Sequence, residues 1–170
     1  MKPNPRGLAA VTGLLLLAVA VLTGCGKDAA AEDAPAEKAT ITVTDPWAKA
    51  AEKGMSAIFG SLVNHSTTDL AVVSATAEIS PLELHEVVEQ DGEMIMRPKE
   101  GGFAVAAGAT HVLEPGGDHI MLMDLAAPLG PGDEIAVTLT LSDGSTVAFT
   151  AVVKDFSGAD ESYEPGMDHS

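Results

Sequence analysis

The sequence predicts an all-β Greek-key sandwich, and two features of the chain support that prediction. From Thr40 onward, short runs rich in strand-forming residues alternate with turn signals every eight to twelve residues or so. No stretch of ten or more residues there carries a helical apolar stripe uninterrupted by glycine or proline. About ten short strands with this spacing are typical of two packed antiparallel sheets.

The expected strands follow one another to residue 154, and turn-forming residues such as Asp45-Pro46, Asp91-Gly92 and Gly101-Gly102 separate them. Their ranges are 40–44, 57–63, 70–78, 82–88, 93–97, 103–106, 110–113, 119–125, 135–141 and 146–154. We therefore place the folded domain at residues 40–156. Residues 157–170 are polar, and we predict a loose C-terminal tail.

The composition limits the class of partner. A chain of 170 residues has room for one domain that can bury a proper core. Aspartate and glutamate number 25 against 9 lysines and arginines, which gives a formal charge of −16. This charge argues against a nucleic-acid partner, because phosphate binding needs a basic face. It fits instead the solubility of an exported protein.

Residues 1–25 have the order of an export signal. Lys2 and Arg6 precede an apolar run from Leu8 to Val21, which is short for a membrane-spanning helix. The end, Leu22-Thr23-Gly24-Cys25, resembles a bacterial lipoprotein signal, in which the cysteine is lipidated and becomes the first residue after cleavage. A plain secretory signal, or an uncleaved anchor with an incidental cysteine, is the alternative. Either way, we expect the domain to work outside the cytoplasm.

Cys25 is the only cysteine, so a disulfide within the chain and a thiolate metal site are both impossible. Residues 26–39 are rich in alanine, glutamate and aspartate and contain no aromatic or β-branched side chain. We read them as a flexible acidic tether between the lipid and the domain. Such a tether keeps the domain near the membrane while leaving it free to reorient.

Histidine and methionine recur at strand spacing in the second half of the predicted domain. Side chains two apart on a strand share a face, which groups His119 with Met121 and Met123, and Met94 with Met96. Thioethers are soft, neutral ligands that favour Cu(I), and neutral imidazole binds it too. Zinc sites draw on cysteine, histidine and carboxylate, and a blue-copper site needs a cysteine. The pattern therefore indicates a pocket for a soft metal, and we expect Cu(I).

The turn between two of these strands decides what lies opposite His85. A four-residue loop over 89–92 would set His85 against Met96, with Cα atoms about 4.5 to 5.5 Å apart. A two-residue loop at Asp91-Gly92 would set Pro98 there instead. We predict the four-residue loop, because it pairs a histidine with a methionine.

Methionine also fills gaps in protein cores, and for Met94 or Met123 alone a packing or rim role is equally expected. His65 and His111 have no methionine nearby, and we predict that both are solvated surface residues. Met167 and His169 resemble a minor metal-catching sequence, but a loose tail is the favoured interpretation.

The segment from His85 to Met121 resembles the periplasmic copper chaperone family called PCu(A)C. That family has a histidine, ten residues, a methionine, about twenty-one residues, and then His-x-Met; here ten residues separate His85 from Met96, and His119-Ile120-Met121 follows. Asp45-Pro46-Trp47 and residues 55–64 are similar too, so the likeness covers about residues 40–154. Met96 and His119 are separated by twenty-two residues, one more than usual. We expect the extra residue in the turn at Gly101-Gly102, because an insertion within a strand would reverse the register.

The resemblance implies a cupredoxin-like β-sandwich that binds Cu(I) through His85, Met96, His119 and Met121. It further implies a non-catalytic carrier that delivers copper toward the binuclear CuA centre of a respiratory cytochrome c oxidase. A thioredoxin-like assembly factor often acts alongside such carriers. An anchor at Cys25 would hold the carrier on the membrane that contains the oxidase.

Two other functional classes compete with this interpretation. The first is a β-sandwich lipoprotein that binds a small ligand or a protein partner and uses the methionines as core. The second is an enzyme, which we consider disfavoured because the sequence offers no nucleophile–base pair, paired carboxylates or glycine-rich phosphate loop.

Overall fold

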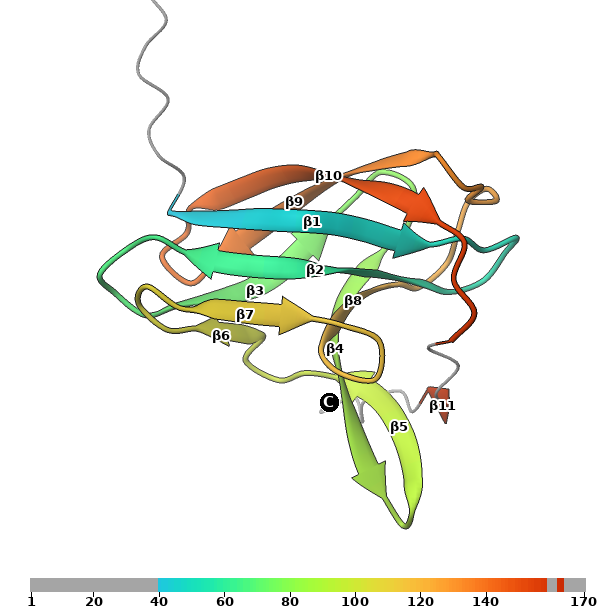
Figure 1. The fold of residues 1–170 in the computed structure, drawn as a ribbon, viewed down its shortest axis with the longest axis horizontal. Helices are drawn as coiled ribbons and strands as arrows, with labels where there is room; N and C mark the ends of the chain where they lie inside the picture. The colour runs from blue at the N-terminus through green and yellow to red at the C-terminus, as the bar shows by residue number, and fades with distance from the viewer. Residues whose placement is uncertain (1–39, 159–161, 164–170) are drawn as a thin grey trace, which may run out of the picture. The chain divides into compact units, whose positions relative to one another are not determined.

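The structure is a computed structural model that describes residues 40–158 and 162–163. The expected all-β class is confirmed: these residues form eleven strands and no helix (Figure 1). In this part of the chain no helix is long and apolar enough to cross a membrane. Cys25, the tether, Met167 and His169 lie outside the described residues.

The strand boundaries agree with the predicted ranges to within a few residues at most ends. In chain order the strands are β1 (Ile41–Lys49), β2 (Ser56–Asn64), β3 (Leu70–Thr76), β4 (Leu82–Gln90), β5 (Glu93–Pro98), β6 (Phe103–Val105), β7 (Thr110–Leu113), β8 (His119–Leu122), β9 (Glu134–Leu141), β10 (Thr146–Lys154) and β11 (Ser162–Tyr163).

The strands are joined in one hydrogen-bonded path rather than in two separate antiparallel sheets. The order is β11-β5-β4-β8-β2-β1-β10-β9-β3-β6, with β7 also paired to β2. The β1–β10 and β11–β5 pairs are parallel, which the sequence pattern did not predict. β2 pairs with β8 along its first half and with β7 along its second. In Figure 1 the β4–β5 hairpin extends away from the rest of the strands.

The main core consists almost entirely of aliphatic side chains. Ile41, Leu62, Val72 and Leu139 are fully buried in it together with Phe103. Each such side chain stabilises the fold by about 1.5 to 3 kcal/mol relative to exposure. This cluster carries most of the stability of the domain.

The first strand does not end at Asp45-Pro46, where the turn signal predicted its end. It continues to Lys49 through a bulge between Thr44 and Trp47, with Asp45 at a φ of 50°. Gly60 on β2 faces the bulge, and a Cβ there would lie 3.2 Å from the Pro46 Cα. A bulge re-aims the side chain that follows it. The Trp47 ring accordingly lies 4.7 Å, centroid to centroid, from the ring of Phe59.

The tail that we expected to be loose contains one short ordered strand. Ser162 and Tyr163 form β11, which pairs in parallel with Ile95 and Met96 of β5. The Tyr163 ring stacks on the His85 ring at 5.4 Å with an interplanar angle of 3°. Apolar contact of the Tyr163 ring with the domain stabilises this position, which a prediction from polarity alone overlooks.

Candidate metal centre

Two buried histidines face each other on neighbouring strands. His85 on β4 is paired directly with His119 on β8, and their ring centroids lie 5.6 Å apart. The exposed fractions are 0% for His85 and 3% for His119. Burial of a polar ring is unfavourable unless its nitrogens find partners, so a buried pair calls for a specific explanation.

The predicted pairing of His85 with Met96 is wrong. The β4–β5 hairpin has a two-residue loop at Asp91-Gly92, which sets His85 against Pro98 and Met96 against Val87. Asp91 and Gly92 have φ values of 53° and 87°. Positive φ at both central positions matches the twist of the flanking strands, so the turn chemistry sets the register. Met96 becomes the diagonal neighbour of His85 and remains on its side of the hairpin.

Met96 and Met121 belong to a second, smaller cluster of buried side chains. Its buried members are Met96, Met121, Ala57 and Phe59, with Val87, Met123, Trp47 and Tyr163 packed against it. Met96, Met121 and His119 also line one cavity of about 60 Å³. His85 joins them through its contact with the His119 ring. The four expected ligands therefore lie together, although the hairpin register differs from the predicted one.

Hydrogen bonds fix which nitrogen of each ring carries a proton. His85 Nε2 lies 2.9 Å from a Glu83 carboxylate oxygen, and His119 Nδ1 lies 2.9 Å from the Gly117 carbonyl oxygen. Both oxygens accept only, so each of these nitrogens donates when the ring is neutral. The lone pairs then sit on His85 Nδ1 and His119 Nε2. His85 Nδ1 is buried and has no hydrogen-bond partner among the described residues, which is unusual for a buried polar atom.

Aromatic rings enclose the two imidazoles. The ring centroids of Phe59 and His119 lie 6.1 Å apart. Trp47 packs on Phe59 and also on Phe156, with 5.3 Å between the Trp47 and Phe156 ring centroids. Tyr163 covers His85, and burial raises the pKa of the Tyr163 hydroxyl, with a further contribution from the Glu83 charge. These walls limit access of water to the histidines.

The remaining methionines differ in position. Met123 packs against the second cluster, but β8 ends at Leu122 instead of continuing to Leu125, and the Met123 amide donates to the Pro81 carbonyl. Met94 is 48% exposed and does not line the cavity. Met55, which we did not predict as a site residue, does line it. The alternation of Met55, Ala57 and Phe59 was the signal available in the sequence.

Outside the cluster, His65 is exposed as predicted, with its Nε2 2.7 Å from the Thr42 hydroxyl. The prediction for His111 is wrong: its ring is partly buried and stacks on Phe103 at 5.5 Å. His111 Nε2 lies 2.9 Å from an Asp118 carboxylate oxygen, close enough for an ion pair but outside hydrogen-bond geometry. Phe103 makes this position partly apolar, and that long-range contact has no local sequence signal.

Asp118, the residue before His119, belongs to a charged network on the surface. Lys99 Nζ lies 3.2 Å from an Asp118 oxygen and 3.0 Å from a Glu86 oxygen, and Arg97 also bonds Glu86. The Lys99 hydrogen bond, followed by that of Arg97, lowers the pKa of Glu86 against the effect of burial. Burial lowers the pKa of Lys99, but the hydrogen bonds to Glu86 and Asp118 outweigh burial, so the pKa is raised overall. The network holds the residue before His119 in place.

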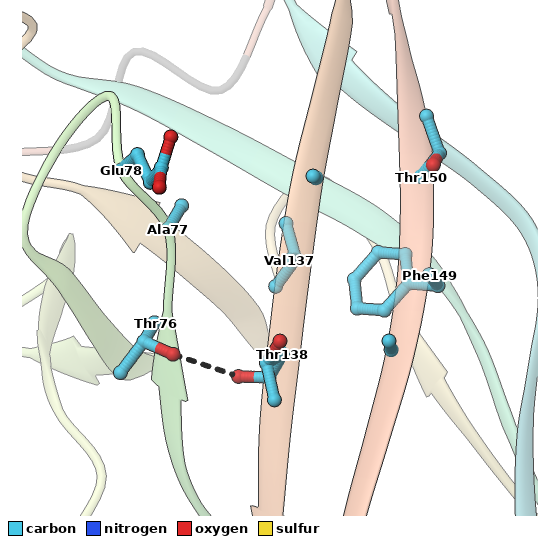
Figure 2. Close-up of a pocket in the computed structure, with 9 residues that line it drawn as sticks. Thr76, Ala77, Glu78, Val137, Thr138, Phe149 and Thr150 are labelled. Carbon is cyan, nitrogen blue, oxygen red and sulfur yellow. Dashed lines mark hydrogen bonds between the residues drawn. The ribbon is translucent and has the colours of Figure 1, made fainter. Parts of the chain in front are cut away.

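A larger concave surface lies elsewhere, over β9 and its neighbours (Figure 2). It has a volume of about 560 Å³ and is lined by small side chains, Phe149 and Glu78, with a Thr76 hydroxyl bonded to the Thr138 carbonyl. It contains no histidine or methionine and shares no residue with the His/Met cavity.

The fold and the second cluster together define a cupredoxin-like β-sandwich domain with a buried histidine–methionine centre. The chain belongs to the family described as "Putative lipoprotein LpqE-like", whose model matches residues 41–153. A relative named "Putative lipoprotein" from Leifsonia xyli is 46% identical over 146 residues, which cover 84% of this chain and 88% of the relative. An uncharacterized protein of Rickettsia prowazekii is 26% identical over 65% of this chain and 64% of its own length.

Solved structures of PCuAC domains share the fold. The copper-bound PCuAC domain from PmoF2 has a TM-score of 0.56 at 18% identity, over 69% of this chain and 94% of that domain. The Cu(I) form of DR1885 from Deinococcus radiodurans has a TM-score of 0.51 at 26% identity, over 72% of this chain and 85% of that protein. The resemblance to the PCu(A)C family, predicted from sequence, is confirmed.

Proposed function

We propose that this protein is a lipid-anchored carrier of Cu(I) that acts outside the cytoplasm and catalyses no reaction. Copper is its cargo, held by His85, Met96, His119 and Met121. The observation that carries the proposal is the buried His85–His119 pair beside two buried thioethers, with His85 Nδ1 left without a hydrogen bond. Core packing alone gives no reason to bury a ring nitrogen unsatisfied.

The donor set suits a monovalent soft ion. Two neutral imidazoles and two thioethers bring no negative charge into the cluster, and thioethers bind Cu(I) in preference to hard cations. Glu83 and Gly117 hold the two rings in the tautomers that direct a lone pair toward a metal. The copper-bound PmoF2 domain and Cu(I)-DR1885, which share the fold, support the same choice of cargo.

Delivery and location form the second part of the proposal. We infer that Cys25 carries the lipid and that residues 26–39 let the domain reach a neighbour on the same membrane. The recipient in this proposal is the binuclear CuA centre of a respiratory cytochrome c oxidase, directly or through a thioredoxin-like assembly factor. The family description as a lipoprotein supports the anchor.

Competition for Cu(I) with a colorimetric chelator tests the proposal. We expect the protein to withdraw one equivalent of Cu(I) from the chelator. Variants of His65, Met167 or His169 serve as controls and should bind copper as the parent does. Failure of the parent to compete at any chelator concentration would refute the carrier function and favour a β-sandwich that binds another ligand.

The anchor and the delivery step need separate measurements. Cys25→Ala should move the protein from the membrane fraction to the soluble fraction and abolish incorporation of a labelled fatty acid. The Cu(I)-loaded domain should transfer its copper to an apo CuA domain. If all of the copper stayed on the carrier after the two proteins had been incubated to equilibrium, that recipient would be excluded.

A further inference from the structure

Met55 is an additional thioether at the mouth of the His/Met cavity. It lines that cavity with Met96, Met121 and His119. Its exposed fraction is 42%, whereas Met96 and Met121 are each 5% exposed. The side chain therefore belongs to the cavity and to the protein surface at the same time.

The strand pattern explains why Met55 points there. Met55 immediately precedes β2, and residues two apart share a face, so it lies on the side of Ala57 and Phe59. Ala57 is paired with Met121 on β8, and all of these residues line the cavity. Met55 thus extends the row of cavity-lining side chains by one position toward solvent.

A ligand at this boundary matters because Cu(I) moves between proteins by exchange of ligands. A thioether is neutral, so it can bind and release Cu(I) with no proton transfer and no change in oxidation state. The buried ligands, enclosed by aromatic rings, are poorly placed to meet a donor in solution. An exposed thioether beside them can bind the ion before its last bond to the donor breaks.

We propose that Met55 is the entry ligand of the carrier: it takes Cu(I) from the donor, passes it to the buried ligands, and reverses these steps at delivery. This role rests on the proposed function. It is a kinetic role, so Met55 lowers the barrier to loading and unloading and adds little to the affinity at equilibrium. Loading and unloading must then change by the same factor when the thioether is removed.

Met55→Leu removes the sulfur while keeping side-chain volume, and Met94→Leu is its matched control. Met94 is 48% exposed on β5 and does not line the cavity. Rapid-mixing experiments would follow Cu(I) exchange with bicinchoninate in both directions, and chelator competition would give the equilibrium constant. We expect Met55→Leu to slow both directions about tenfold, comparable to the loss of a supporting residue at a metal site. The equilibrium constant should stay close to the parental value, because both rate constants fall by the same factor.

The outcomes separate this inference from the carrier function. Met55→Leu exchanging at the parental rate, or slowing no more than Met94→Leu, would overturn the entry role while the carrier function stands. A loss of affinity with unchanged loading would make Met55 a ligand of the resting site and would overturn it too. A parent protein that takes up no Cu(I) would instead refute the proposed function itself.

Discussion

The two faces of β8 and β2 lead into different kinds of core. On one face, the side chains of Ile120, Leu122 and Ile58 belong to the large aliphatic cluster. The opposite face sends Met121, Ala57 and Phe59 into the small cluster that adjoins the two histidines. All four residues of β8 are buried, so burial alone does not distinguish the two sides.

The two clusters differ in the residue types that they contain. The large cluster contains no nitrogen or sulfur ligand, and packing accounts for all of it. The small cluster buries methionines, which specify a core poorly, beside imidazoles that are unfavourable in an apolar environment. Stability therefore accounts for the first cluster, whereas the second is accounted for by the proposed binding of copper.

Shortening a side chain in the large cluster should have the largest effect on the free energy of unfolding. Leu139→Ala, at a fully buried position on β9, should lower the free energy of unfolding by about 2 to 5 kcal/mol. Copper affinity should stay at the parental level under conditions where the variant is folded. Urea unfolding of the apo-protein with Cu(I) competition on the same sample checks both, and a large loss of affinity in folded Leu139→Ala would show that the two faces are not independent.

Changes in the small cluster should show the opposite pattern. Met121→Leu and His119→Ala each remove one donor, and we expect a loss of Cu(I) affinity of about a hundredfold, equivalent to about 2.7 kcal/mol. Met121→Leu conserves volume, so the apo-protein should lose less than about 1.5 kcal/mol of stability. Chelator competition and urea unfolding measure the two quantities. Parental affinity in either variant would remove that residue from the proposed site.

Glu83 sharpens the comparison because it is not one of the proposed ligands but accepts a hydrogen bond from His85, which is. Glu83→Ala removes the acceptor of the Nε2–H, and we expect about a tenfold loss of Cu(I) affinity. Glu83→Gln keeps an oxygen that can accept this hydrogen bond and should recover most of the loss. Nitrogen chemical shifts of His85 report its tautomer directly. Equal losses in both variants would argue against a tautomer effect.

The smallest expected effect belongs to the charged network beside the small cluster. Lys99→Met should lower the free energy of unfolding by about 1 kcal/mol near neutral pH, as for other partly exposed ion pairs. The pKa of Glu86 is lowered from 4.5 in the folded state, so its contribution is present above that value and disappears as the pH falls through the lowered pKa. Urea unfolding at neutral and acidic pH should show the difference shrinking in acid, and a constant difference would exclude this electrostatic origin.

The sequence predicted the class of fold and most of the strands because period-two patterns and turn residues are local signals. It also grouped the four expected ligands, since His119 and Met121 share a strand face and the family spacing adds His85 and Met96. The twenty-two-residue interval did not displace His119, which pairs with His85 in register. Gly101 and Gly102 both adopt positive φ in the turn that follows β5, where an added residue leaves the strands unchanged.

Other features depend on contacts that are distant in sequence. The hairpin register was misjudged because the pairing of ligand types was weighed above the Asp91-Gly92 turn signal. The partial burial of His111 depends on Phe103, and the order of Tyr163 depends on β5 and His85. The alternation of Met55, Ala57 and Phe59 groups these side chains on one face, but the pairing of β2 with β8 is what brings that face to the cavity.

X-ray absorption at the copper edge of the Cu(I)-loaded protein tests most directly whether the small cluster is a copper site. Copper should be bound by two sulfur and two imidazole nitrogen neighbours, with one sulfur lost in Met96→Leu and in Met121→Leu. A copper environment without sulfur, or one that neither substitution alters, would contradict the assignment of these methionines and histidines.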